Sequence, residues 1–183
     1  MAEHHKPRWA WAITGSGHYI RECLEIMQTL DAVDVYLSQA GEEVLKMYRI
    51  DLAALHARFA VYRDKAASAP PVGLFYHSHY HTLVIAPTTS NTVAKCVLGI
   101  ADSLVTNLYA QAGKCRVPTL VYPCDTAPEM LTTAPNGEVM VYPRPVDLEA
   151  TAKLRSMPYT QVVEDVWQLR DAIHAIQQRH APQ

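Results

Sequence analysis

Three short polar turns in this sequence carry groups that could bind a phosphate. Each turn follows an apolar run and precedes a stretch in which apolar residues recur at helical spacing, so each is expected to start a helix. The free backbone N–H groups and the positive dipole end of a helix N-terminus attract anions. These turns therefore indicate a phosphate site formed by Gly15, Ser16, Gly17, Ser38, Thr89, Ser90, Asn91 and Thr92.

The same residue types are also ordinary helix N-caps, and capping is the favoured explanation for any one turn taken alone. The Gly-x-Gly turn lacks the third glycine of a dinucleotide fingerprint, and Ser38 stands where a ribose-binding carboxylate would be expected. A mononucleotide such as FMN therefore fits these turns better than a dinucleotide.

Composition limits what else the chain could be. Its 183 residues are 49% hydrophobic and 19% charged, which is enough for one domain with a sizeable core. The net charge is −2 and there is no run of Lys or Arg, so we expect no nucleic-acid partner. The four scattered cysteines predict free thiols in a reducing compartment. The apolar stretch after Trp9 is too short for a signal or a membrane span, so we expect a cytoplasmic protein with no membrane partner.

Strands and helices are predicted to alternate along the chain. Strands are expected at residues 9–14, 33–37, 83–86 and 117–122, and helices after the first three of them. One helix should carry Val93, Val97, Ile100 and Leu104, and a final helix should run from Val162 to Ile176. Residues 1–8 are expected to be disordered or extended, residues 51–71 to form surface structure, and residues 124–146 to form an elaborated loop or hairpin.

This alternation predicts a doubly wound, flavodoxin-like α/β fold with a parallel sheet in a single domain. Ligands of such folds bind where the carboxyl ends of the strands meet helix N-termini, and the polar turns belong to that edge.

Two further groups of residues could carry chemistry. His77, His79 and His81 alternate, so a strand would point all three to one face, where they could hold a metal or give a proton. The alternative is that they lie at an irregular entry to the third strand or at a subunit contact, and we expect no metal. Cys124 and Asp125 follow the fourth strand, but no base follows Cys124 within its turn to activate the thiol. We expect Cys124 to pack near a ligand.

The turns resemble the flavin-binding motifs of the homo-oligomeric flavin-containing cysteine decarboxylase family. The matching segments are ITGSG at 13–17, SQA at 38–40, IAPTTSNTVAK at 85–95 and GIADSL at 99–104. The resemblance implies FMN as cofactor and a homotrimer, or a multiple of trimers, with flavin at the subunit interface. It also implies that residues 15–17 and Ser38 hold the phosphate region, that residues 89–92 line the flavin and its ribityl chain, and that Cys124 lies near the ring.

The sequence departs from the decarboxylating members of that family. Gly73 stands near the place of their catalytic histidine, and Pro123-Cys124-Asp125-Thr126 replaces their Pro-Ala-Met-Asn substrate clamp. The remaining pattern is similar to the branch that contains FMN-dependent dihydromethanopterin reductases. That resemblance implies hydride transfer from reduced flavin to a dihydropterin, with NAD(P)H or a protein as electron donor.

Two other activities stay open at this point. An electron-transfer flavoprotein would exchange electrons with a protein donor, and a phosphopantothenoylcysteine-type decarboxylase would release carbon dioxide. For the pterin reaction we expect Asp125 to act as the catalytic residue, although His77, His79 and Tyr122 could also supply the proton.

Overall fold

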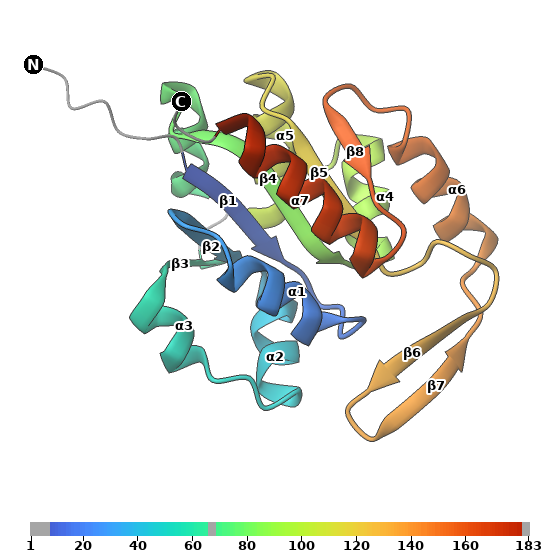
Figure 1. The fold of residues 1–183 in the computed structure, drawn as a ribbon. Coiled ribbons are helices and arrows are strands. Elements are labelled where there is room, and N and C mark those ends of the chain that lie inside the picture. Colours follow the sequence, from blue (N-terminus) through green and yellow to red (C-terminus); the bar gives the residue numbers. More distant parts are fainter. Residues whose placement is uncertain (1–7, 66–68, 181–183) are drawn as a thin grey trace, which may run out of the picture.

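The computed structural model of the chain describes residues 8–65 and 69–180, which form a parallel sheet covered by helices on both faces (Figure 1). The sheet has six strands in the order β3-β2-β1-β4-β5-β8. The strands are β1 (Arg8–Ile13), β2 (Val33–Leu37), β3 (Ala60–Arg63), β4 (Tyr80–Thr88), β5 (Thr119–Pro123) and β8 (Thr160–Val162). This is the single-domain, flavodoxin-like fold that the sequence predicts.

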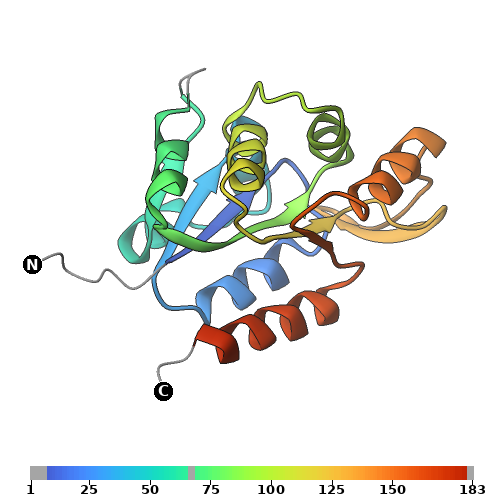
Figure 2. The same ribbon diagram turned by 90° about the horizontal axis from the view of Figure 1, so that it is seen from above.

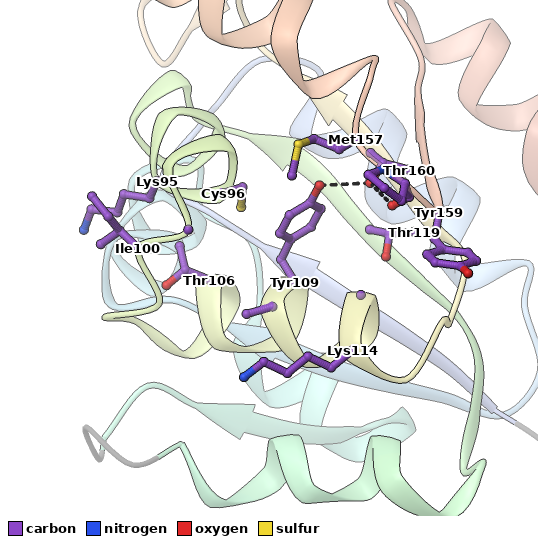
Figure 3. Close-up of a pocket in the computed structure, with 14 residues that line it drawn as sticks. Lys95, Cys96, Ile100, Thr106, Tyr109, Lys114, Thr119, Met157, Tyr159 and Thr160 are labelled. Atoms are coloured by element: carbon purple, nitrogen blue, oxygen red, sulfur yellow. Dashed lines mark hydrogen bonds between the residues drawn. The ribbon is translucent and has the colours of Figure 1, made fainter.

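Two hydrophobic cores lie on opposite faces of the sheet. Helices α1 (Ile20–Gln28) and α7 (Val166–His180) cover one face, and α4 (Ser90–Leu98) and α5 (Leu104–Lys114) cover the other (Figure 2). Side chains of β1 alternate between the cores because successive strand residues point to opposite faces. Trp9, Trp11 and Ile13 enter the first core, and the smaller Ala10 and Ala12 enter the second.

The remaining elements lie around this sheet. Helices α2 (Gln39–Met47) and α3 (Leu52–Arg58) follow β2, the 3-10 helix η1 (Pro70–His77) precedes β4, and α6 (Pro145–Leu154) precedes β8. The antiparallel hairpin of β6 (Met130–Ala134) and β7 (Gly137–Val141) extends away from the body of the protein (Figure 1). This hairpin lies within the segment expected to form a loop or hairpin.

The single helix expected through Val93, Val97, Ile100 and Leu104 is wrong. Gly99 has a φ of 74°, a left-handed conformation that ends α4. Ser103 then caps a separate helix, α5, whose capping box also uses Thr106. The apolar spacing therefore ran across a helix end.

The start of the last helix also differs from expectation. Val162 is the final residue of β8, and α7 begins at Val166. Helices α5 and α6 and the edge strand β3 were not anticipated as separate elements. Residues 1–7, expected to be disordered or extended, lie outside the described residues, whereas Arg8 belongs to β1.

The described part of the chain holds no helix with the length and apolarity that a bilayer crossing requires.

A buried polar network ties the first strands together at the amino edge of the sheet. Asp34, only 3% exposed, accepts hydrogen bonds from Arg8 Nε (2.9 Å) and Tyr80 Oη (2.7 Å). Tyr36 Oη lies 2.6 Å from Tyr80 Oη, and His79 Nε2 lies 3.4 Å from Asp34 Oδ2. Because β1, β2 and β4 are adjacent, this one carboxylate links the three strands.

Replacing Asp34 with Ala should destabilise the protein by about 3 kcal/mol, because removing one partner of a buried ion pair leaves the other groups without compensation. Urea unfolding monitored by circular dichroism measures the change. Asp31→Ala, at an exposed turn, is the control and should leave the midpoint unchanged. Equal midpoints for both variants would show that the Asp34 network adds no net stability.

Candidate functional site

The turns that end β1 and β4 are joined to each other by hydrogen bonds at the carboxyl edge of the sheet. Thr14 Oγ1 donates to the Pro87 carbonyl at 3.0 Å and accepts from Thr89 N at 2.8 Å. Ser38 N donates to the Ile13 carbonyl at 3.1 Å, which attaches the end of β2 to the same place. The polar turns predicted from the sequence therefore meet at one edge.

Two glycines allow the turn after β1 to approach the N-terminus of α2. A Cβ at Gly41 would lie 2.5 Å from the Ile13 carbonyl oxygen, and a Cβ at Gly15 would lie 2.6 Å from Ala40 Cβ. Both distances are shorter than a van der Waals contact between the two atoms. Any larger residue at Gly15 or Gly41 would push the helix start away from β1.

A cavity of about 380 Å³ opens between these turns. The N-termini of α2 and α4 both face it, and their first-turn N–H groups have no acceptor within the helix. Its lining comprises Gly15, Ser38, Gln39, Ala40, Asp64, Lys65, Thr89, Asn91, Thr92, Lys95, Asp102 and Ser103. Five of the residues predicted for the phosphate site, Gly15, Ser38, Thr89, Asn91 and Thr92, are therefore together in one cavity.

The hydroxyl groups at this cavity also cap the helices. Ser38 Oγ accepts a hydrogen bond from Gly41 N at 2.9 Å, and Thr89 Oγ1 accepts one from Thr92 N at 3.2 Å. The capping explanation is thus correct for Ser38 and Thr89. It does not exclude an anion, because a hydroxyl has a further lone pair and a rotatable proton.

Cations and carboxylates both line the cavity. Lys95 Nζ contacts Asp102 Oδ2 at 2.7 Å, and this hydrogen bond lowers the pKa of the Asp102 carboxyl. Asp64 Oδ2 accepts from Leu104 N at 3.1 Å, at the start of α5. Lys95 and Lys65 can balance the charge of an anion at the two helix N-termini.

The other predicted residues form a second polar group beside the cavity. Ser90 Oγ donates to Asp125 Oδ2, and Cys124 Sγ lies 4.0 Å from Ser90 Oγ. Burial, followed by the charge of Asp125, raises the pKa of the Cys124 thiol to about 11, so it stays protonated at neutral pH. Neither Ser90 nor Cys124 lines the cavity; both stand at its margin with Asp125.

Ser16 and Gly17 do not line the cavity. Ser16 Oγ accepts a hydrogen bond from His18 N at 3.2 Å. Gly17 lies against the Tyr48 hydroxyl, which donates to the Thr133 carbonyl of β6 at 2.7 Å. A Cβ at Gly17 would overlap the Tyr48 ring, so this glycine allows the hairpin to be held in place.

His18 also lies in this region, and the sequence analysis did not identify it as a candidate site residue. It is 6% exposed, and its Nδ1 lies 2.9 Å from Thr132 Oγ1 of the hairpin. Burial lowers the pKa of His18, and the nearby charge of Asp125 opposes that effect. The only signal in the sequence was its place directly after the glycine-rich turn.

The three alternating histidines do not belong to this site. His77 ends η1, His79 contacts Asp34, and His81 in β4 stacks on His180 with ring centroids 4.3 Å apart. All three lie at or before the start of β4, the opposite edge of the sheet from the cavity. Within residues 8–65 and 69–180 no cluster of His, Cys, Asp and Glu could hold a metal ion. Within one chain, His77 and His79 therefore lie away from this cavity.

The chain is similar to proteins of known activity and structure. A dihydromethanopterin reductase (acceptor) of Methanosarcina mazei is 38% identical over 141 residues, which are 70% of this chain and 59% of that protein. The enzyme of the same description from Methanocaldococcus jannaschii is 40% identical over 136 residues, 67% of this chain and 55% of that protein. This chain thus matches less than two thirds of the length of either reductase.

The solved structure of DmrB from Burkholderia xenovorans in complex with FMN, described as a cubic protein cage for redox transfer, has a TM-score of 0.88 and 44% identity. The match covers 95% of this chain and 97% of DmrB. The sequence profile of the Flavoprotein family matches residues 1–178. The chain therefore belongs to the flavoprotein family.

Proposed function

We propose that the chain binds FMN at the cavity, with the phosphate at the N-termini of α2 and α4. The cavity supports this assignment because two helix N-termini, the Ser38 and Thr89 hydroxyls and two lysines converge on it. The chain is similar over nearly its whole length to DmrB, which was solved with FMN, and this similarity supports the same cofactor here. Gly15 and Gly41 allow the start of α2 to lie directly against the turn after β1, beside this cavity.

The reaction that we assign to this site is the reduction of a dihydropterin, with dihydromethanopterin as the substrate. The observation that carries the assignment is the Ser90–Asp125 pair at the margin of the cavity, in a chain 38% and 40% identical to two dihydromethanopterin reductases. When bound, reduced FMN supplies a hydride to the C=N bond of the pterin.

The residues of the chain itself bind and orient the substrate and exclude water. Asp125, fixed by Ser90, can accept hydrogen bonds from the amino and ring N–H groups of a pterin. The Thr151 hydroxyl holds the Asp125 backbone carbonyl at 3.0 Å, so the carboxylate is positioned from both sides. The protonated Cys124 thiol does not act as a nucleophile.

Decarboxylation of a cysteine-terminated substrate fits this chain less well. A phenylacrylic acid decarboxylase and a cysteine decarboxylase of similar architecture are each 18% identical, and such a likeness concerns the fold alone. Gly73 lies in η1 and carries no side chain that could act as a base.

We further infer that the protein assembles as a homotrimer or a multiple of trimers and works in the cytoplasm. The cage formed by DmrB supports assembly of a chain with this fold. All four cysteines are free, which fits a reducing compartment.

Replacing Ser38 with Asp should weaken FMN binding by at least ~100-fold, because a carboxylate would then face the phosphate dianion. Asp is as good an N-cap as Ser, so α2 should still form. Fluorescence titration of the apoprotein with FMN measures the dissociation constant. The control, Ser156→Asp at an exposed position after α6, should bind as the native protein does. Unchanged affinity in Ser38→Asp would place the phosphate elsewhere.

Photoreduced, FMN-loaded protein mixed anaerobically with dihydromethanopterin should regain its oxidised flavin absorbance and yield the tetrahydropterin. Ferricyanide, a one-electron acceptor, serves as a positive control for a reactive flavin. No carbon dioxide should form from a cysteine-terminated peptide. Reoxidation by ferricyanide but by no dihydropterin would favour an electron-transfer protein instead.

Sedimentation velocity should give a mass that is a multiple of three times the 20.4 kDa chain. If the flavin contacts two subunits, removal of FMN should also promote dissociation, because a ligand stabilises the state that binds it. A stable monomer loaded with FMN would contradict the proposed assembly.

A further inference from the structure

The His18 ring is held at the margin of the site by groups from three elements. Tyr19, at the start of α1, packs edge-on against it with ring centroids 4.6 Å apart, and Tyr122 of β5 lies 5.8 Å away. Thr132 of the hairpin contacts its Nδ1 at 2.9 Å. The ring orientation is therefore determined by packing and by one hydrogen bond.

Tyr19, the residue after His18, has an unusual backbone conformation. Tyr19 has φ 49° and ψ 32°, in the left-handed region that non-glycine residues seldom occupy. Helix α1 starts only after this residue, with Ile20 N donating to the Gly17 carbonyl at 3.2 Å. Conformations of this kind persist where the surrounding structure requires them, often at functional sites.

Two polar atoms in this cluster lack a partner among the described residues. His18 Nε2 makes no hydrogen bond within 8–65 and 69–180, while Nδ1 is bound to Thr132. Tyr122 is only 1% exposed, and its Oη has no hydrogen-bond partner among the same residues. A buried hydroxyl left unpaired is unfavourable, so a bound molecule or an ordered water is expected as its partner.

We propose that His18 is a catalytic residue of the pterin reaction, donating a proton from Nε2 to the pterin ring nitrogen that is reduced. This inference rests on the proposed function. It deepens that function by assigning the proton donor to His18 and leaving Asp125 to orient the pterin.

The step balances in atoms and charge. The reduced flavin gives a hydride to the carbon of the C=N bond and becomes oxidised, and the nitrogen receives the proton from the His18 imidazolium. The product is a CH–NH unit and a neutral imidazole, which regains a proton from water. The Thr132 hydroxyl can accept from Nδ1–H both before and after the transfer, so the ring keeps its orientation.

The charged and titratable groups around His18 come from several elements. Tyr19 and Tyr122 pack against the ring, Cys124 and Asp125 follow β5, and Arg144 lies beyond Asp125. Burial lowers the pKa of His18 below its ordinary value of 6.5, and Asp125 counteracts this effect. Since the protonated form is the donor, the pterin half-reaction should slow as the pH rises through that pKa.

The test compares His18→Gln with the native protein by anaerobic stopped-flow absorbance. Pterin-driven reoxidation of the flavin should slow by at least ~100-fold, because a positioned general acid typically contributes 10²–10⁴-fold. FMN affinity and reoxidation by ferricyanide, which needs no proton, should stay unchanged. His77→Gln, an exposed histidine at the other edge of the sheet, is the matched control and should react at the native rate.

A second measurement separates proton donation from a structural role. NMR titration of His18 in the FMN-loaded native protein gives its pKa directly, and the pH profile of the pterin half-reaction should have the same pKa. Asp125→Asn removes the charge that raises the pKa of His18, so both values should fall together. A kinetic pKa that stays in place while the NMR value shifts would overturn the proposal.

The remaining outcomes are also distinguishable. A native rate of pterin-driven reoxidation in His18→Gln would reject His18 as the donor while leaving the proposed function intact. Native protein that reacts with ferricyanide but with no dihydropterin would reject the proposed function and this inference together.

Discussion

The close approach of the turn after β1 to the start of α2 is the contact on which the site depends. Gly41 lies so near the Ile13 carbonyl, and Gly15 so near Ala40, that a methyl group at either position would separate the two elements. The start of α2 therefore lies against the turn after β1, and the first residues of α2 and α4 line the same cavity of about 380 Å³. Both helix dipoles can then act on one anion.

The site has two chemically different parts that share the turn of residues 89 and 90. Thr89 lines the cavity, where two helix N-termini and two lysines suit a phosphate group. Ser90 contacts Asp125 on the other side, where Cys124, His18 and Tyr122 also gather. With the proposed FMN phosphate in the first part, the Asp125 carboxylate lies beside the cofactor site in the second part.

The two edges of the sheet have separate tasks because all of its strands run parallel. The amino edge holds Asp34 with Arg8, Tyr80 and His79, a network that links three strands. The carboxyl edge carries the polar turns. Polar groups at the first edge contact one another, whereas at the second edge the buried Tyr122 hydroxyl has no hydrogen-bond partner within residues 8–65 and 69–180.

The sequence alone determined the fold class and most of the polar turns that meet at the carboxyl edge, since apolar runs followed by Gly, Ser and Thr report local backbone preferences. It did not reveal the break at Gly99, because the apolar spacing continued across a helix end. His18 was also hidden, because its partner Thr132 is 114 residues away and belongs to a separate hairpin. Contacts between distant segments leave no periodic pattern in a single sequence, so only the tertiary structure could decide which polar residues face one another.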